Sequence, residues 1–451
     1  MTISTSIQSE RETGIHVIDT TAMDTTCEPL TTPKHVYTTQ FEKDLSLIQD
    51  HLLPNIKLEK FSYEGYDHVT WYVSNSKQAS AYFITCLGFK PLAYKGLETG
   101  SRAICCHVVT NGKAIFQFVS PLRSEFKANK EYDEQVKEIN NFIVTHGDGA
   151  KDVAFTVDDV DTIFSTAIEN GAKAIEYPET INDEFGSVRI AKVGIFGDTT
   201  HTLVNRSDYI GPFLPGYLDI GESNVFNTFS SDLINSLPKV DLIRIDHCVQ
   251  NQGWNKMDES CEFYAKAFGF HRFWSVDERD VSTEYSALKS IVMAANNDVV
   301  KMPINEPAKG KFKSQIEEFI DYYNGPGVQH IAILTDDIIS AISAMKQRGC
   351  EFIEVPDKYY DDLRKRLGHS NMQILQPLEE IQKLGILVDF DDNGYLLQLF
   401  TKPLVVRPTV FVEVIERHNH NGFGAGNFKA LFETIEHEQK ARGNLTSEDI
   451  E

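Results

Sequence analysis

The sequence predicts an α+β fold of two duplicated domains, each built from paired strand–helix–strand units around an open barrel. Two observations lead to this prediction. The buried-strand pattern GVQHIAI at 327–333 occurs a second time as GAKDVAF at 149–155. The stretch YDHVTWYVSN, which begins at Tyr66, resembles IDHCVQNQ, which begins at Ile245. Both pairs are separated by 178 or 179 residues, so one half of the chain repeats the other.

A helix follows each of these strands in the predicted order. The stretches SAYFITCLGFKPLAY and CEFYAKAFGFHRFWS follow the first strand of each half. The stretches DDVDTIFSTAIENGAKAI and DDIISAISAMKQRGCEFI follow the second strand. Their apolar residues recur at i, i+3 and i+4, and a glycine closes the last turn as a helix C-cap does. Short alternating strands such as HTLVNR and GYLLQLF then complete mixed or antiparallel sheets, which gives each unit a βαβββ pattern.

The chain of 451 residues is long enough for two or three domains. We expect a first domain over 60–215, a linker over 216–239 and a second domain over 240–451. The preceding segment, 1–59, is rich in Ser and Thr at its start and poor in large apolar residues there. Its acidic residues do not fit a mitochondrial transit peptide, so we expect a partly disordered extension.

Composition excludes several classes of partner. Lys and Arg number 43 against 66 Asp and Glu, a net charge of −23, which argues against nucleic acid and anionic membrane surfaces. No apolar run approaches the ~18 residues of a membrane-spanning helix. The seven cysteines have irregular spacing and no CxxC pair. We therefore expect reduced thiols in a cytoplasmic protein.

Three strands carry residues that could bind a metal. Alternate side chains of a strand share one face, so each strand has a predicted inward-facing set. These sets are Ile245, His247 and Val249; Val328, His330 and Ala332; and Thr409, Phe411, Glu413 and Ile415. His247, His330 and Glu413 are evenly spaced, 83 residues apart. Two imidazoles and one carboxylate on a concave surface form the ligand set of non-haem Fe(II) enzymes, which keeps open coordination positions.

Each of these residues also has an ordinary structural interpretation. A single histidine in a strand is usually a hydrogen-bonded core residue, and a buried Glu413 could pair with Arg417 instead of a metal. Glu416 is a rival carboxylate, although it has the opposite strand parity. We expect His418 and His420, in ERHNHNGFG, to be solvated loop residues.

The duplication favours the metal interpretation. The first half repeats the strand of His330 with Asp152 in its place, and Lys151 stands where the second half has Gln329. The scaffold is therefore kept while the candidate ligand changes. We interpret Asp152 as a scaffold residue, and both Gln329 and His330 as functional candidates.

The chain resembles the 4-hydroxyphenylpyruvate dioxygenase family of the vicinal-oxygen-chelate (glyoxalase-like) superfamily. The resemblance covers about 60 to 445 and rests on many stretches, among them GLETGSR, FGDTTHTLV, IGPFLPGY, KMPINEPA, LLQLFTKP, RPTVFVEVIERHNHNGFGAGNF and EQKARGNL. It implies one Fe(II) per chain, held by His247, His330 and Glu413. The acidic N-terminal extension lies outside the family pattern.

The resemblance also implies a substrate pocket closed by a C-terminal lid helix, NFKALFETIEHEQKARGNL. Its polar residues would be Ser290, Asn305, Gln315, Gln329 and Gln398. Its walls would be Phe400, Phe411, Phe423, Asn427, Phe428 and Phe432. Gln439 and Arg442 could hold the lid through Glu318. Taken alone, the phenylalanines would be ordinary core residues, and Gln315 and Gln439 exposed helix residues.

The implied reaction converts 4-hydroxyphenylpyruvate and O2 to homogentisate and CO2, and the resemblance implies a homodimer acting in tyrosine catabolism. One alternative is 4-hydroxymandelate synthase, which shares the implied fold, metal and substrate, and product analysis separates the two. Another is a non-catalytic binding protein, which would take up no O2. A glyoxalase or extradiol dioxygenase on the same fold is usually shorter and lacks the GFGAGNF segment.

Overall fold

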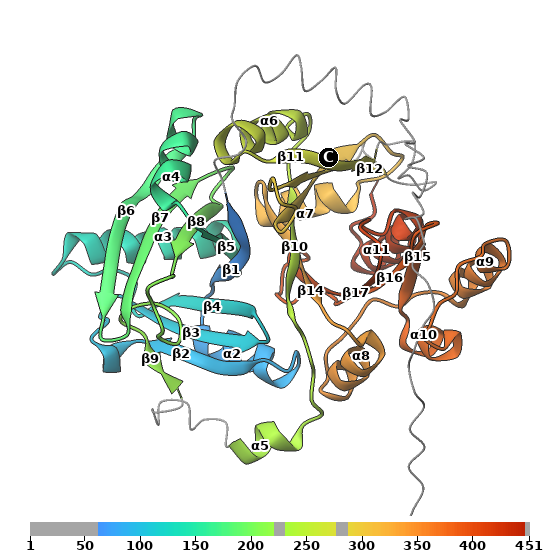
Figure 1. The fold of residues 1–451 in the computed structure, drawn as a ribbon, viewed down its shortest axis with the longest axis horizontal. Coiled ribbons are helices and arrows are strands. Elements are labelled where there is room, and N and C mark those ends of the chain that lie inside the picture. The colour runs from blue at the N-terminus through green and yellow to red at the C-terminus, as the bar shows by residue number, and fades with distance from the viewer. Residues whose placement is uncertain (1–61, 221–230, 277–286, 447–451) are drawn as a thin grey trace, which may run out of the picture. The chain divides into compact units, whose positions relative to one another are not determined.

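The computed structural model describes residues 62–220, 231–276 and 287–446. The predicted N-terminal extension, 1–59, lies outside the described residues. Two sheets organise the described chain, one in each half of the repeat (Figure 1). No helix in these ranges is long and apolar enough to cross a membrane.

The first sheet has nine strands in the order β6-β7-β8-β5-β1-β4-β3-β2-β9. The strands are β1 (Tyr63–Tyr72), β2 (Lys90–Lys95), β3 (Ile104–Asn111), β4 (Ala114–Pro121), β5 (Gly149–Val157), β6 (Lys173–Asp183), β7 (Gly186–Gly194), β8 (Thr200–Asn205) and β9 (Leu218–Asp219). The helices of this half are α2 (Ser76–Thr85), α3 (Lys130–His146) and α4 (Val160–Glu169), with a short 3-10 helix η2 (Leu97–Thr99).

The second sheet has eight strands in the order β11-β12-β13-β10-β14-β17-β16-β15. The strands are β10 (Arg244–Asn251), β11 (His271–Val276), β12 (Ala287–Ala294), β13 (Lys301–Ala308), β14 (Gly327–Leu334), β15 (Leu387–Phe390), β16 (Tyr395–Phe400) and β17 (Phe411–His418). The helices are α6 (Met257–Phe268), α7 (Gln315–Tyr323), α8 (Ile338–Gln347), α9 (Asp357–Gly368), α10 (Leu378–Leu384) and α11 (Phe428–Arg442), preceded by the 3-10 helix η5 (Ala425–Asn427).

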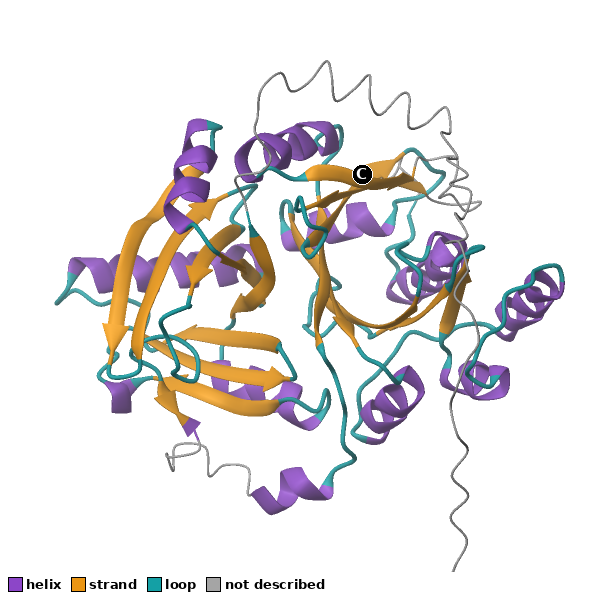
Figure 2. Ribbon diagram, in the orientation of Figure 1, coloured by secondary structure: helices purple, strands orange, loops and turns teal. Residues whose placement is uncertain are grey.

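The strand pairings confirm the predicted α+β duplication. In the first half β1 lies antiparallel to β5 and parallel to β4, and β5 lies parallel to β8. In the second half β10 lies antiparallel to β14 and parallel to β13, and β14 lies parallel to β17. Each sheet curls, and α11 lies within the curve of the second sheet (Figure 2). The strands β1, β5 and β8 therefore correspond to β10, β14 and β17.

The segment expected to be a linker has structure of its own. The strand β9 lies within 216–239 and pairs with β2, so the first sheet continues past the expected limit. The helix α5 (Ser231–Ser236) follows in the same segment. The two halves belong to one compact unit, Ile56–Glu451. Hydrogen bonds join the halves, such as those from Arg348 to the carbonyls of Ile84 and Thr85, at 3.2 and 3.1 Å.

A β-bulge corrects the predicted facing of β10. Ile245 pairs with Ile333 and His247 with Ala332, which leaves Asp246 as an extra residue between them. The strict alternation that placed Ile245 on the face of His247 is therefore wrong, because a bulge shifts the side-chain parity by one residue. Ile245 turns into the hydrophobic core instead.

A second bulge lies in β14. Gln250 pairs with Val328 and Val249 with His330, so Gln329 is the extra residue here. Val328 consequently packs in the core and does not share the face of His330 as predicted. The first half repeats both irregularities. Its register skips Asp67, before His68, and Lys151, before Asp152. Each bulged residue thus immediately precedes a position where the second half has a candidate ligand.

Candidate metal centre

Three strands of the second sheet bring His247, His330 and Glu413 together. His247 on β10 pairs with Ala332 on β14, and Ala332 pairs with Glu413 on β17. Because Ala332 contributes only a methyl group, the imidazole and the carboxylate on either side of it can meet. Potential ligand atoms of the three residues all lie within 4.8 Å of one another. Oε2 of Glu413 is 3.2 Å from Nε2 of His247 and 3.4 Å from Nε2 of His330.

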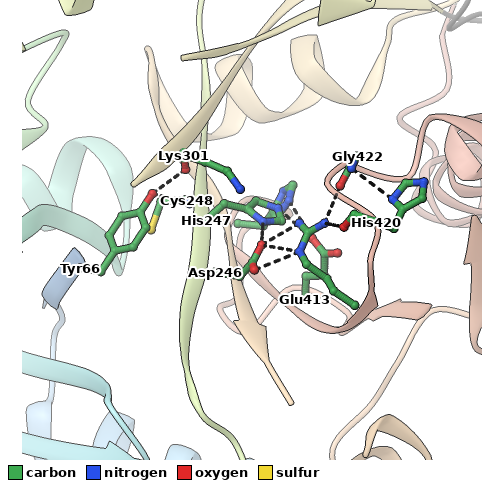
Figure 3. A network of polar contacts seen from close by, with 10 residues as sticks. Tyr66, Asp246, His247, Cys248, Lys301, Glu413, His420 and Gly422 are labelled. Atoms are coloured by element: carbon green, nitrogen blue, oxygen red, sulfur yellow. Dashed lines mark hydrogen bonds and ion pairs between the residues drawn. The ribbon is translucent and has the colours of Figure 1, made fainter. Parts of the chain in front are cut away.

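The two bulged residues hold the far side of each imidazole. Nδ1 of His247 lies 2.7 Å from Oδ2 of Asp246, and Nδ1 of His330 lies 3.1 Å from Oε1 of Gln329. A ring nitrogen that donates to such an oxygen leaves the other nitrogen unprotonated and free to bind a cation. Figure 3 shows Asp246 beside His247, with Glu413 on the other side of the ring. The bulges thereby orient both Nε2 atoms toward Glu413.

The electrostatics of the cluster fit a bound cation. Burial by itself raises the pKa of Glu413, but His247 and His330 lower it to about 2, so this carboxylate is ionised near neutral pH. Burial lowers the pKa of His330. For His247 burial acts in the same direction, yet the carboxylates of Glu413 and Asp246 raise its pKa overall. Oε1 of Glu413 is buried and has no hydrogen-bond partner among the described residues. A divalent cation between the three side chains would satisfy it.

Aromatic rings surround the imidazoles. Phe411 stacks on His330 with ring centroids 4.9 Å apart, and the edge of Phe400 meets the same ring at 5.8 Å. Phe423 contacts His247 edge to face at 5.1 Å. Three of the predicted wall residues thus lie against the candidate ligands, and they keep this side of the cluster apolar.

A cavity of about 40 Å³ lies beside Phe400 and Phe411, the two rings that pack against His330. It is lined by Gln315, Gln329, Phe400 and Phe411, which were predicted, and by residues of α7, α11 and the neighbouring loops. Pockets that bury a drug-sized molecule usually measure about 300 Å³ or more. Because Ile435, Glu438 and Arg442 of α11 form one wall, movement of this helix would enlarge the cavity. Figure 1 shows α11 within the curve of the second sheet.

Other predicted pocket residues lie elsewhere in the second half. Ser290 and Asn305 face each other on β12 and β13, and Asn305 donates to Oδ1 of Asn251 at 3.3 Å. Gln398 is buried, and its Nε2 has no partner among the described residues. A Cβ on Gly424 would lie 2.2 Å from that nitrogen, so the segment before α11 packs directly on the Gln398 amide.

The remaining wall residues belong to the start of α11. Asn427 accepts a hydrogen bond from the Tyr359 hydroxyl at 2.7 Å. Phe432 is buried in α11. The side chain of Phe428 lies outside the described part of the structure. The binding roles assigned to these residues remain predictions.

The comparisons with known proteins agree with this geometry. Residues 244–399 match the family model "Glyoxalase/Bleomycin resistance protein/Dioxygenase superfamily". A 4-hydroxyphenylpyruvate dioxygenase of Aspergillus fumigatus is 58% identical over 388 residues, which are 85% of this chain and 94% of that protein. The corresponding protein of Yarrowia lipolytica is 53% identical over 384 residues, 85% of this chain and 94% of its own length. The chain belongs to the 4-hydroxyphenylpyruvate dioxygenase family.

The solved structures support the same fold. A variant of 4-hydroxymandelate synthase from Streptomyces coelicolor aligns with a TM-score of 0.69 and 27% identity, over 84% of this chain and 99% of the other. Its identity to the chain is about half that of the dioxygenases. The predicted resemblance is therefore confirmed, and the chain is an oxidoreductase of the 4-hydroxyphenylpyruvate dioxygenase family.

Polar contacts hold the C-terminal helix of this dioxygenase-family chain in place. Arg442 donates to both carboxylate oxygens of Glu318 on α7, at 3.1 and 2.9 Å, and Asn444 donates to the same group at 2.7 Å. Gln439 is fully buried, but its amide has no hydrogen-bond partner among the described residues. Arg442 thus makes the predicted contact with Glu318 and Gln439 makes no hydrogen bond to it.

We expect α11 to open more often in Arg442→Met, since this change removes the cationic partner of Glu318, a carboxylate that is 5% exposed, and leaves it only the neutral amide of Asn444 among the contacts described above. Losing such a charged hydrogen bond costs about 1–3 kcal/mol, or roughly 5- to 150-fold in the opening equilibrium. Hydrogen exchange of the amides in α11 measures this change. Lys402→Met is the matched control, because the Lys402–Glu438 pair at 3.1 Å is more exposed and adds little. Equal exchange in both variants would contradict the role of Arg442.

The loop histidines correct a prediction. His420 is 6% exposed and its Nδ1 accepts from the backbone N–H of Gly422 at 3.1 Å, so it is not a solvated residue. His418 stacks on Tyr395 and lies 2.6 Å from a carboxylate oxygen of Glu416. Glu416 also accepts from the backbone N–H of Ile338 at the start of α8, and so lies on the opposite face from the metal candidates.

The sequence reasoning missed two further residues, Asp246 and Arg417. Arg417 pairs with Asp246 at 2.8 Å and not with Glu413, the partner considered for it. A signal was available in the repeat, because the dipeptide Asp-His occurs in both YDHV and IDHC. An aspartate that precedes the histidine in both copies, beside a bulge, is typical of a group that orients the ring.

Proposed function

We propose that the chain converts 4-hydroxyphenylpyruvate and O2 to homogentisate and CO2, with one Fe(II) held by His247, His330 and Glu413. The observation that carries the proposal is the convergence of these three side chains, with Glu413 ionised and one of its oxygens unpartnered. Relatives named 4-hydroxyphenylpyruvate dioxygenase at up to 58% identity over 85% of the chain support the reaction.

The reaction balances without a second organic substrate. The 2-oxo acid side chain loses its carboxyl group as CO2, one oxygen atom of O2 enters the new carboxylate, and the other becomes the new ring hydroxyl. The side chain moves to the neighbouring ring carbon. Fe(II), when bound, supplies the binding and reduction of O2 that this oxidative decarboxylation requires.

The protein's own groups prepare the site. Asp246 and Gln329 hold the Nδ1 side of the two imidazoles, so that the Nε2 lone pairs point at the cation site. Phe400 and Phe411 offer an apolar wall for an aromatic ring, and the amides of Gln315 and Gln329 offer hydrogen bonds to its polar groups. The helix α11 closes the pocket and excludes water from the reacting oxidant.

Product analysis tests the proposal. The purified chain, loaded anaerobically with Fe(II) and then given 4-hydroxyphenylpyruvate and O2, should form homogentisate, with one CO2 released for each O2 consumed. Formation of 4-hydroxymandelate would identify a synthase instead. That alternative has the weaker support, since the synthase structure is 27% identical to the chain. No O2 uptake with bound iron would indicate a non-catalytic binding protein.

The cellular setting is a further part of the proposal. We assign the enzyme to the cytoplasm, to tyrosine catabolism and to a homodimer, following the family resemblance. The six described cysteines are all free thiols, which fits a reducing compartment. Light scattering of the purified protein tests the dimer, and fractionation of cells tests the compartment.

A further inference from the structure

One arginine joins the metal centre to the segment before the lid helix. Arg417 donates through Nε and Nη2 to the carboxylate of Asp246, with the shortest contact at 2.8 Å. Its remaining nitrogen, Nη1, donates to the backbone carbonyls of His420 and Gly422, at 3.1 and 2.6 Å. Figure 3 shows Asp246 beside His247, with His420 and Gly422 in the same network of polar contacts.

The arginine also contacts an aromatic ring of the same segment. Its guanidinium lies over the ring of Phe423 at 5.4 Å, and Phe423 in turn meets the imidazole of His247 at 5.1 Å. Asp246 in turn contacts Nδ1 of His247, so Arg417, Asp246, His247 and Phe423 form one closed set of contacts, the arginine network. The guanidinium is planar and has donors on both edges, so it can hold a carboxylate on one side and two carbonyls on the other.

The first half contains the same arrangement without metal ligands. Arg206 donates to both oxygens of Asp67, at 2.8 and 2.6 Å, and Asp67 contacts Nδ1 of His68 at 2.6 Å. Arg206 also donates to the carbonyl of Phe213, whose ring meets His68 at 4.9 Å.

The ligand positions differ between the halves. By the shared register, Asp152 and Thr202 stand where the second half has His330 and Glu413. Oδ2 of Asp152 accepts from the Thr200 hydroxyl at 2.6 Å. Among the described residues, the cluster of potential metal ligands occurs in the second half alone. The arginine network is thus a property of the duplicated scaffold. Of its two copies, only that of Arg417 adjoins the candidate metal site.

We propose that Arg417 is a positioning residue that couples the orientation of the ligand His247 to the order of the segment 419–427, and so to the lid. The proposal rests on the proposed iron site. With the segment in place, Arg417 holds Asp246, and Asp246 holds the ring of His247 with Nε2 toward the cation. When the segment leaves, Nη1 loses both carbonyls and the Phe423 ring no longer supports His247.

The two halves supply a matched pair of variants, Arg417→Lys and Arg206→Lys. A lysine keeps the charge but has a single nitrogen, which cannot reach the aspartate and the carbonyls together. Arg417→Lys should weaken Fe(II) binding by about 10- to 100-fold, the usual effect of removing a residue that orients a metal ligand. Arg206→Lys should leave Fe(II) affinity unchanged. Anaerobic competition with a chromogenic chelator measures both constants without any turnover.

Hydrogen exchange provides the second readout. In Arg417→Lys the amides of 419–427 should exchange about tenfold faster, which corresponds to a loss of about 1.4 kcal/mol of local stability there. In Arg206→Lys the faster exchange should appear at 207–214 instead. The conservative pair Asp246→Asn and Asp67→Asn tests the same link from the aspartate, should the lysine variant not fold.

The outcomes separate this inference from the proposed function. Wild-type protein that binds no Fe(II) would remove the proposed function itself. Wild-type binding with an unchanged constant in Arg417→Lys would overturn the inference alone. Equal weakening by Arg417→Lys and Arg206→Lys would show a loss of general stability and would overturn it too. Weaker Fe(II) binding without faster exchange of 419–427 would overturn the coupling to the lid.

Discussion

Replacing Glu413 with glutamine is expected to abolish both iron binding and turnover. The substitution keeps the shape of a side chain that is 2% exposed and removes its charge. Two neutral imidazoles then remain, without the anion that offsets the cost of a buried cation. We expect Fe(II) affinity and the rate of O2 uptake to fall by at least about a thousandfold, since one ligand of three is lost. Chelator competition and an oxygen electrode measure the two effects.

The control for this variant lies on the same strand. Glu416→Gln also removes a buried carboxylate, one that caps the start of α8 through the N–H of Ile338. It should lower thermal stability and leave Fe(II) affinity unchanged. Retention of full iron occupancy in Glu413→Gln would show that this carboxylate is not a ligand. Loss of iron in both variants would point to a general effect of removing charge from β17.

The duplication and the candidate ligands could be predicted because they leave a signal in one sequence. A repeat offset by 178 or 179 residues exposes the position where Asp152 replaces His330. Glu413 stands out as a carboxylate between two valines, which is costly without a partner. The structure brings these residues together, and it confirms the α+β duplication through equivalent strand pairings.

The bulges could not be predicted from alternation. Both faces of β10 and β14 are buried, so apolar residues occur at odd and even positions alike and no break in parity is visible. Ile245 was therefore assigned to the wrong face. The same bulges put Asp246 and Gln329 beside the imidazoles. The contacts that orient the candidate ligands thus come from the irregularities that strand periodicity conceals.

The long-range polar contacts could not be predicted from the sequence either. Arg417 and Asp246 are 171 residues apart, and nothing in either local pattern pairs them. A charged residue at the end of a strand is usually exposed, and His420 was expected in solvent as a residue of the following loop. His420 is buried and Arg417 is half-buried because the turn after β17 folds back, so that the carbonyls of His420 and Gly422 reach the guanidinium.

A substitution at Ala332 should eliminate the metal site without touching a ligand. Ala332 is fully buried and stands between His247 and Glu413 in the strand register. In Ala332→Leu the added carbons would occupy the space where Oε2 of Glu413 and Nε2 of His247 now lie 3.2 Å apart. We expect Fe(II) affinity to fall by at least about a hundredfold and the overpacked core to lose about 1–3 kcal/mol of unfolding free energy.

Ala154→Leu separates these two effects, because Ala154 pairs with His68 in the first half as Ala332 pairs with His247. It is equally buried, so a similar loss of stability is expected from the same added volume. Its Fe(II) affinity should equal that of the wild type, since no ligand adjoins it. Chemical denaturation and chelator competition on both variants make the comparison. Normal iron binding by Ala332→Leu would mean that the cation does not lie between the three side chains, because leucine leaves no room for it there.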